Sequence, residues 1–379
     1  MENITRKKQL AATGYSAFLC SGICAISAGV IVSILQEKYG FSFSVSGTLL
    51  SVMSIGNMLA SFAAGILPGK IGPRNTVALL CSGYFIGYLL MAFFGNVGIL
   101  IVAFLVVGIA KGGTINNCTV LVGNNSKDRT KGMSLMHACY AGGAMLCPFL
   151  ITWLTGINTS LPMIGIAVCG LVLWLIFYSA KLPKVSEDKG EKKKTDFSFM
   201  KDKYFWYLTG LIFCQNAAET AVTGWLVTYY KNNGILSGNL STYTVTIMWG
   251  ATLIARLLVA FVIPIKNTFK SITIMGIGCT ILYLCLVNVN TPVMAIIALF
   301  GFAFAMAPVN PVGMAGIGKA MNETSVGVLL PIAGLGQIVM PWIIGIFADS
   351  IGLSSAMALN VIPCAGIIIM SILCLKNSK

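Results

Sequence analysis

The sequence has few charged side chains. Only 9% of its 379 residues are Asp, Glu, Lys or Arg, whereas soluble domains carry about 25%. So few charges cannot cover the water-facing surface of a chain this long, and 57% of the residues are apolar. We therefore predict that lipid surrounds most of the molecule. Backbone polar groups in lipid must be satisfied inside a helix or a closed barrel, and long uninterrupted apolar runs favour helices.

The sequence also has few residues that could build a catalytic or metal centre. His137 is its single histidine, only 11 residues are acidic, and the longest polar stretch is residues 181–203. The 12 cysteines all fall within apolar runs, where they are typical packing residues. We therefore expect no enzyme, no metal site and no cofactor.

Twelve apolar segments are each long enough to cross about 30 Å of hydrocarbon as a helix. They lie at residues 10–36, 43–68, 76–95, 97–122, 132–155, 160–182, 204–230, 240–263, 271–289, 292–317, 325–348 and 353–375. The first run is too long for the apolar core of a signal peptide. The sequence therefore predicts an all-α membrane protein with twelve transmembrane helices.

The positive charges follow this topology. If both termini face the cytoplasm, 21 of the 25 Lys and Arg residues lie on the cytoplasmic side, with Lys38 and Lys231 outside and Lys111 and Arg256 within spans. This asymmetry obeys the positive-inside rule and predicts a multi-pass protein of the cell (inner or plasma) membrane with both termini cytoplasmic. It also accounts for the net charge of +14, so we expect the lipid bilayer and no nucleic acid as a partner.

The chain divides into two similar halves. The polar stretch 181–203 is predicted as a cytoplasmic linker between an N-terminal six-helix half, 1–180, and a C-terminal six-helix half, 204–379. Several residues recur at an offset of 193: Gly108, Ala110, Asn117, Gly143 and Pro148 correspond to Gly301, Ala303, Asn310, Gly336 and Pro341. Parallel repeats of this kind are typical of transporters that bind their solute near the bilayer midplane.

Between the second and third segments, the sequence reads GILPGKIGPR from Gly65 to Arg74. It resembles the loop pattern G-x-x-x-D-R-x-G-R-R of the major facilitator superfamily. Gly65 and Gly72 suit a tight turn and close helix approach, and Lys70 and Arg74 suit the cytoplasmic end of a span, so we expect a gating loop here. Gly69 replaces the Asp of the family, and a charge interaction that uses this Asp is not expected.

Further segments resemble the fucose permease branch of that superfamily, which carries sugars. Residues 137–148 (HACYAGGAMLCP) and 219–229 (ETAVTGWLVTY) are similar to its fifth and seventh spans, and 307–311 and 336–349 to its tenth and eleventh. The resemblance implies two pseudo-symmetric six-helix halves and secondary transport. The first span lacks the acid of fucose permease, and Gly113 stands where the acid of the fourth span would fall, so that coupling apparatus does not carry over.

Three charged side chains lie well inside predicted spans: Lys111, Glu219 and Arg256. Because each costs about 2.5–3.5 kcal/mol at a helix centre, such residues normally face a partner or a wet cavity. They form either a structural ion pair, such as Glu219 with Arg256 or Lys111, or part of the substrate or ion path. Two cations and one carboxylate leave one positive charge without compensation. Either Lys111 loses its proton through desolvation, or an anionic substrate that Lys111 or Arg256 binds supplies the missing negative charge.

Polar and aromatic residues at mid-span depth complete the candidate substrate site, since amides bond hydroxyls and aromatic rings stack on sugars. The predicted substrate-binding residues are Lys111, Asn116, Asn117, Tyr140, Gln215, Asn216, Glu219, Trp225, Trp249, Arg256, Asn310 and Gln337. Glu219 and His137 are the candidates for ion coupling, because protonation of Glu219 would cancel a buried charge and the histidine titrates near neutrality. Packing is the alternative role for each. Prolines 308, 311, 331 and 341 mark the tenth and eleventh spans as gating helices.

These observations predict a secondary active transporter that moves a small polar solute, a sugar or sugar derivative, by alternating access. The candidate coupling ions are a proton and a sodium ion, and we expect a monomer. An organic-anion carrier that uses Lys111 and Arg256 is the alternative within the class. A transport-like membrane sensor is the other alternative.

Overall fold

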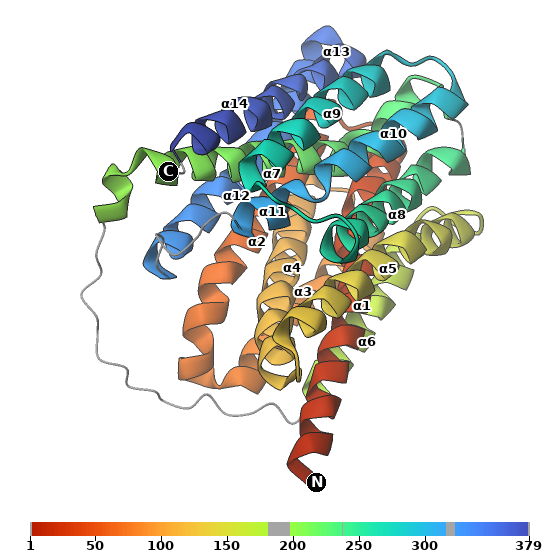
Figure 1. Ribbon diagram of the computed structural model, residues 1–379. Coiled ribbons are helices and arrows are strands. Elements are labelled where there is room, and N and C mark those ends of the chain that lie inside the picture. Colours follow the sequence, from red (N-terminus) through yellow and green to blue (C-terminus); the bar gives the residue numbers. More distant parts are fainter. Residues whose placement is uncertain (1, 181–197, 237, 316–322, 378–379) are drawn as a thin grey trace. The chain divides into compact units, whose positions relative to one another are not determined.

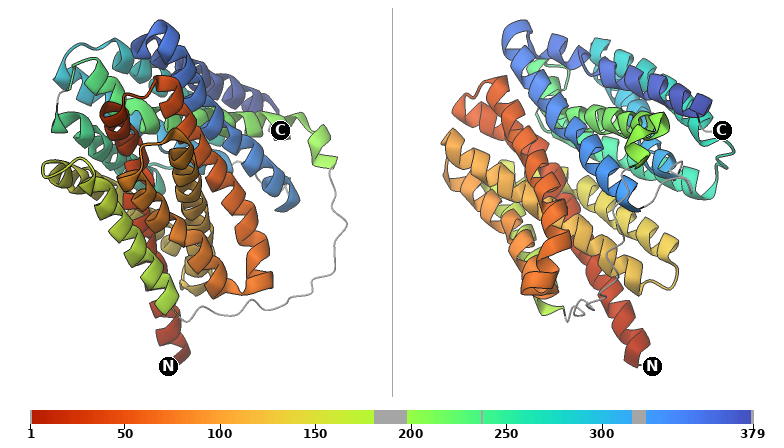
Figure 2. Two further views of the ribbon diagram at one scale, coloured as in Figure 1. Left: turned by 180° about the vertical axis from the view of Figure 1, so that it is seen from behind. Right: turned by 90° about the vertical axis from the view of Figure 1, so that its left-hand side faces the viewer.

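A computed structural model of the protein describes residues 2–180, 198–236, 238–315 and 323–377. Every regular element in these ranges is a helix, as Figures 1 and 2 show. The elements are α1 (Glu2–Tyr39), α2 (Phe43–Ile71), α3 (Pro73–Phe93), α4 (Val97–Asn125), α5 (Arg129–Thr155), α6 (Leu161–Ser179), η1 (Ser198–Lys201), α7 (Lys203–Asn232), α8 (Asn239–Phe261), α9 (Thr268–Asn288), α10 (Pro292–Met306), α11 (Val309–Ala315), α12 (Glu323–Ile351), α13 (Leu353–Ala358) and α14 (Val361–Asn377).

Twelve helical segments match the twelve predicted spans. Within the described ranges, 11 are long and apolar enough to cross a membrane, with α10–α11 and α13–α14 each counted as one. The twelfth is α7, whose 30 residues exceed what about 30 Å of hydrocarbon requires. Gln215, Asn216 and Glu219 lower the hydropathy of α7. The predicted all-α membrane fold is confirmed.

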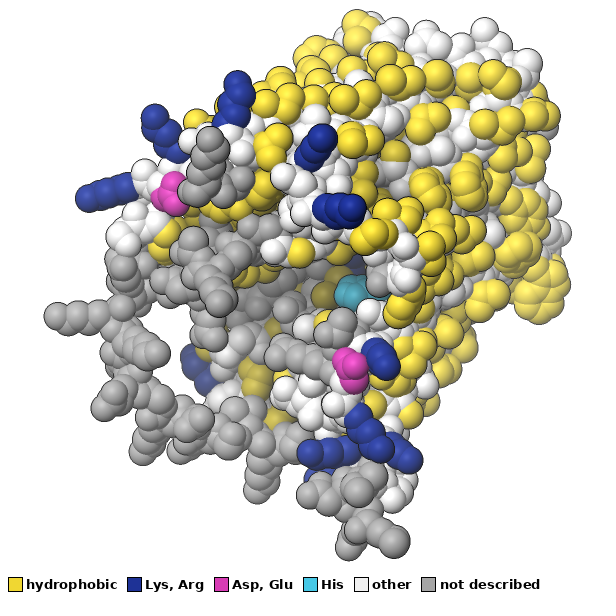
Figure 3. All heavy atoms as spheres, in the orientation of Figure 1, with side chains coloured by type: hydrophobic (Ala, Val, Ile, Leu, Met, Phe, Trp, Pro, Cys, Tyr) yellow, Lys and Arg dark blue, Asp and Glu magenta, His cyan; other side chains and the backbone are white. Residues whose placement is uncertain are grey.

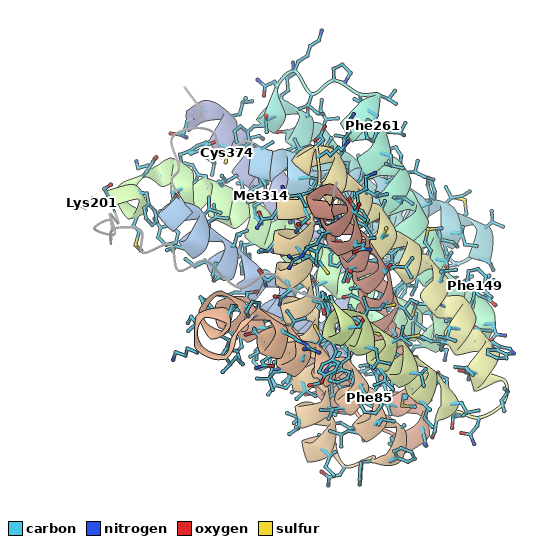
Figure 4. The ribbon with its side chains drawn as sticks, turned by 90° about the horizontal axis from the view of Figure 1, so that it is seen from below. Phe85, Phe149, Lys201, Phe261, Met314 and Cys374 are labelled. Atoms are coloured by element: carbon cyan, nitrogen blue, oxygen red, sulfur yellow. The ribbon has the colours of Figure 1, made fainter. Side chains whose placement is uncertain are left out.

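The outward surfaces of the helices are apolar. Phe149 on α5 and Phe261 at the end of α8 are 52% and 68% exposed, and Figure 4 shows both on the outside. Hydrophobic side chains cover much of the upper and right-hand part of the face seen in Figure 3. Exposed aromatic and aliphatic groups of this extent require an apolar solvent, which agrees with a bilayer around the helices.

Polar and proline residues define where the helices begin. The Asn96 side chain accepts hydrogen bonds from the backbone N–H groups of Gly98 (2.9 Å) and Ile99 (3.3 Å) at the start of α4. Side chains cap three further helices in the same way: Asp128 for α5, Asp202 for α7 and Asn267 for α9. These bonds satisfy N–H groups that have no intrahelical acceptor. Three other helices begin with a proline in the first turn, which needs no N–H partner.

The chain forms two compact units. Unit 1 contains the residues up to Phe41 and those from Thr48 to the end of α6; unit 2 contains Ser42–Gly47 and everything from η1 onward. Helix α2 thus begins in unit 2 and continues in unit 1. In unit 1, α1 packs on α4, α5 and α6, and α3 packs on α4 and α6. In unit 2, α7 packs on α8, α12 and α14, and α9 packs on α10 and α14.

Equivalent glycines bring equivalent helices together in the two units. In unit 1 a methyl group on Gly143 of α5 would overlap the backbone oxygen of Leu19 on α1. In unit 2 a methyl group on Gly336 of α12 would overlap the backbone oxygen of Phe213 on α7. The two glycines are 193 residues apart, as the repeat predicted, and both permit backbones to approach without an intervening side chain.

The two proline-containing spans differ from each other, and their gating role stays a prediction. The tenth predicted span is interrupted, since α10 ends at Met306 and α11 begins at Val309. The eleventh is one continuous helix, because α12 runs through Pro331 and Pro341 without a break. Residues 181–197 of the predicted linker lie outside the described residues, and the assignment of 1–180 and 204–379 as halves stays a prediction.

Candidate functional site

A chain of side-chain amides leads to the carboxylate of Glu219 in unit 2. Gln215 lies one turn before Glu219 on α7, is fully buried, and donates from Nε2 to Glu219 Oε2. The other end of this amide, Gln215 Oε1, accepts a 2.9 Å hydrogen bond from Asn310 Nδ2 on α11. The amide of Gln215 thus presents its N–H to the carboxyl group and its oxygen to Asn310.

The break between α10 and α11 positions Asn310. Ala307 follows the last residue of α10, and the residue four positions later is Pro311, which has no N–H to donate. Ala307 O instead accepts a 3.4 Å bond from Arg256 Nε of α8. A cation at the C-terminal end of a helix is also favoured by the helix dipole. Arg256 therefore holds one side of the break, and Asn310, on the other side, is bonded to α7.

Two other predicted residues of α7 bond to the backbone of α12. Asn216 Nδ2 donates to Ala333 O at 3.0 Å, and Trp225 Nε1 donates to Pro341 O at 3.1 Å. Trp225 is 0% exposed, so it has the contacts of a packing residue. Its predicted contact with substrate stays a prediction.

The remaining candidates of unit 2 are Trp249 on α8, which is buried, and Gln337 on α12, which is half-buried. Next to Glu219, the hydroxyl of Thr223 donates to Glu219 O at 2.8 Å and lies 3.9 Å from Met248 Sδ. Thr223 therefore bonds the backbone oxygen of Glu219, whereas Gln215 bonds its side-chain carboxylate.

In unit 1, Lys111, Asn116 and Asn117 are half-buried on α4. Asn117 Nδ2 donates to Gly113 O at 2.7 Å. Asn116 Nδ2 donates to Gly112 O at 2.8 Å and to Ser61 Oγ at 3.2 Å. Both amides thus have part of their donor capacity satisfied within the unit.

The predicted residues of α5 are grouped around one ring of α1. Phe18 lies edge-on to His137, with centroids 5.7 Å apart, and contacts Tyr140 at 5.0 Å. Tyr140 is buried and His137 is exposed. The coupling role of His137 stays a prediction.

The loop motif of residues 65–74 forms a turn at one glycine only. Gly72 has φ +81° and precedes α3, whereas Gly65 lies within α2 with nothing near its Cα that a methyl group would meet. Arg74 Nε donates to Tyr178 O at 3.1 Å, and its guanidinium lies 4.3 Å from the Tyr178 ring centroid. Arg74 therefore bonds a free carbonyl at the end of α6 and makes a cation–π contact there. Lys70 is exposed.

The structure brings Gln215, Glu219 and Asn310 together, although the sequence proposed them only as separate candidates. Glu219 bonds Gln215, and Arg256 bonds Ala307 O. The ion pair of Glu219 with Arg256 or Lys111, considered as an alternative, stays a prediction. The guanidinium satisfies a carbonyl that the helix break leaves without a partner. Pro311 indicates in the sequence that Ala307 O lacks a helical donor, but the sequence does not show that Arg256 is the donor that replaces it.

Sequence reasoning assigned no role to Asp349, at the end of α12. In unit 2 its two carboxylate oxygens accept hydrogen bonds from the N–H groups of Phe43 (2.8 Å) and Ser44 (2.9 Å) in the first turn of α2. A carboxylate at a helix N-terminus is favoured by both the free N–H groups and the dipole. A signal was present, since Asp349 closes the segment that resembles the eleventh span of fucose permease.

Together, the apolar helices and the few polar groups held inside them define a multi-pass α-helical membrane protein. Residues 14–332 match the Major Facilitator Superfamily, and the chain belongs to this family. The predicted family membership is thus confirmed. Family and relatives point to a transporter rather than to an enzyme.

Two characterised relatives are transporters of different solutes. A gallate transporter of Pseudomonas putida is 26% identical over 161 residues, which are 40% of this chain and 36% of that protein. The glucose transporter GlcP of Staphylococcus epidermidis is 24% identical over 163 residues, which are 42% of this chain and 36% of that protein. The matched segments therefore span about a third of each relative's length.

The fold is shared along the whole chain with a solved transporter. A point mutant of the nucleoside transporter NupG superposes with a TM-score of 0.80 at 15% identity, covering 99% of this chain and 100% of that one. This similarity establishes the fold.

Proposed function

We propose that the protein is a secondary active transporter of the cell membrane, with both termini in the cytoplasm, that moves a small polar solute by alternating access. The observation that supports this proposal best is the Asn310–Gln215–Glu219 chain beside an interrupted transmembrane helix. Broken helices are tolerated in a membrane only where they are buried in protein or line a water-filled cavity, and in transporters they form solute and ion sites.

The solute in this proposal is a sugar or a sugar derivative. The half-buried amides of Asn116, Asn117 and Gln337 can each donate and accept, as hydroxyl groups require. The similarity to a glucose transporter supports the same class.

Glu219 is the coupling group in this proposal, and a proton is the coupled ion. It is the one acidic residue in the middle of a predicted span, and it is half-buried. Protonation would cancel a charge that is expensive at membrane depth and would thereby shift the balance between the two access states.

Uptake by proteoliposomes tests the assignment. Glu219→Gln should abolish uphill uptake driven by a pH gradient while leaving solute counterflow intact, because exchange needs no net proton movement. Glu37→Gln, at an exposed carboxylate near the end of α1, is the matched control and should retain both. Unchanged uphill uptake by Glu219→Gln would remove Glu219 from this role, and an absence of any flux would favour a sensor.

An organic-anion carrier is the second candidate. Lys111 and Arg256 outnumber Glu219 inside the predicted spans, and one relative transports gallate, an aromatic carboxylate. Competition experiments separate the two: neutral sugars should inhibit uptake in a sugar carrier, whereas only sugar acids and other carboxylates should inhibit in an anion carrier.

A further inference from the structure

Asn310 lies where a break in a membrane helix adjoins the hydrogen-bond chain to Glu219. Its Nδ2 bonds Gln215 Oε1 at 2.9 Å, and the opposite end of the Gln215 amide bonds Glu219. Asn310 belongs to the first turn of α11, directly after the break. Its contact with α7 therefore depends on the geometry of that break.

The buried amide of Gln215 has two possible orientations with opposite consequences for Glu219. With its N–H toward the carboxylate, it stabilises the ionised form, which can only accept. With its oxygen toward the carboxylate, it repels that form and instead accepts a bond from the protonated carboxyl group. Because Gln215 is 0% exposed, water cannot satisfy either end, and the neighbouring side chain decides the orientation.

Asn310 is that neighbour in the structure: its Nδ2 donates to the oxygen of Gln215, and the N–H of Gln215 is then directed to Glu219. We propose that Asn310 is a positioning residue that orients Gln215 so that Glu219 is held ionised, and that the α10–α11 break acts on the coupling carboxylate through this bond. The inference rests on the proposed coupling role of Glu219. In this inference Asn310 affects coupling through Gln215 and does not itself bind the solute or the proton.

Hydrogen bonds fix the chain on both sides of the break between α10 and α11, so a movement there would displace Asn310. Arg256 of α8 bonds Ala307 O before Pro308, and Asn310 bonds Gln215 after it. Further along α11, Gly313 packs against Ile212 of α7. A movement at the break that displaces Asn310 would release Gln215 and favour the protonated form of Glu219.

The other charged groups around α7 are few. Among the described residues, the elements that pack most extensively on it are η1, α8, α11, α12, α13 and α14. Their charged residues are Lys201 in η1, Arg256 in α8, Glu323 and Asp349 in α12 and Lys376 in α14, and their further titratable residues are Tyr243, Cys364 and Cys374. Only Arg256 is charged and distant from an element's end, and its Nε bonds Ala307 O.

Asn310→Leu removes the donor and tests the inference. Gln215 is then free to turn, so the pH of half-maximal uphill uptake should rise by about one unit, which is a tenfold change in the protonation equilibrium. Each pH profile is normalised to that variant's own maximal uptake, so that a change in solute binding is separated from a change in pH dependence. Asn310→Asp has nearly the same shape and offers an acceptor instead of a donor, so it should shift the profile in the same direction if the leucine variant folds poorly.

Asn360→Leu is the matched control. Asn360 is a buried asparagine of the same unit that donates to Ala218 O on α7 at 3.2 Å. Ala218 directly precedes Glu219, so this bond reaches the same part of α7 through the backbone. Replacement of Asn360 should lower thermal stability and leave the pH of half-maximal uptake unchanged. A purely structural Asn310 would give the same result as this control.

The outcomes separate the inference from the function on which it rests. If Glu219→Gln retains uphill uptake, the proposed coupling role fails. If Glu219→Gln loses uphill uptake but both Asn310 variants keep the wild-type pH profile, the positioning role is overturned and the coupling role stands. If both Asn310 variants raise the pH of half-maximal uphill uptake and Asn360→Leu does not, the positioning role is supported.

Discussion

The indole N–H of Trp225 on α7 donates a 3.1 Å hydrogen bond to the backbone carbonyl of Pro341 on α12. Both residues lie in segments that resemble the fucose permease branch, and the ring is fully buried. The bond joins a side chain to a backbone acceptor, so the two motifs are connected through packing.

Shortening this side chain should destabilise unit 2 in two steps. Trp225→Phe keeps an aromatic ring but removes the donor to Pro341 O, which should lower the free energy of unfolding by about 1 kcal/mol. Trp225→Ala also empties the ring's volume, for a total of about 3–5 kcal/mol. Thermal unfolding in detergent measures both, with Trp153→Ala, at a 68% exposed position, as the control. Equal unfolding temperatures for Trp225→Phe and wild type would show that the bond contributes nothing.

The repeated glycines should be intolerant of even one methyl group. Gly143→Ala and Gly336→Ala would each place Cβ against a backbone oxygen of the facing helix, which should cost about 1–3 kcal/mol through helix displacement. Gly142→Ala and Gly334→Ala lie next to these sites, with nothing within 4 Å of the added carbon. Thermal unfolding of all four variants should separate the pairs, and similar values would contradict the close approach.

Replacing Arg74 by lysine should leave the membrane topology unchanged but lower the stability of the fold. Lysine keeps the positive charge on the same side of the membrane but cannot reproduce the Nε bond to Tyr178 O together with the ring contact. Arg74→Lys should therefore insert normally and unfold about 1 kcal/mol more easily. Lys70→Arg at a neighbouring exposed position should change neither property. A shift in Lys70→Arg as large as in Arg74→Lys would contradict this account.

Asp349 should protect the first turn of α2. Removing the carboxylate with Asp349→Ala frees the N–H groups of Phe43 and Ser44, a loss of about 0.3–1 kcal/mol at an exposed helix end. Hydrogen exchange at these two amides should accelerate up to about fivefold, since about 1.4 kcal/mol is tenfold. Asp349→Asn retains one acceptor and should fall between Ala and wild type; no change in either variant would argue against the cap.

Much of the fold was predictable because lipid leaves a chain few alternatives. Long apolar runs predicted the twelve helices, including α7 despite its polar residues. The offset of 193 predicted that Gly143 and Gly336 would occupy equivalent positions. The ends were less predictable: α1 begins at Glu2 rather than near residue 10, because a helix can continue in water beyond the bilayer.

The site was predictable as a set of residues but not as an arrangement. Gln215 and Glu219 stand four residues apart, so their contact on one helix face follows from helical geometry. The bond from Asn310 depends on where the chain resumes its helix after Met306 and on how α11 packs on α9 and α7. The carbonyl partners of Arg256, Asn216 and Trp225 could not be read from side-chain identity at all.

Proton movement during solute entry tests the central claim most directly. Proteoliposomes loaded with a pH-sensitive dye, without a pH gradient and with the membrane potential held at zero, would receive neutral sugars and sugar acids in turn. Coupling through Glu219 predicts that one of these solutes acidifies the lumen in wild type and enters without acidification in Glu219→Gln vesicles. Entry of solute into wild-type vesicles with no change in lumenal pH would contradict it.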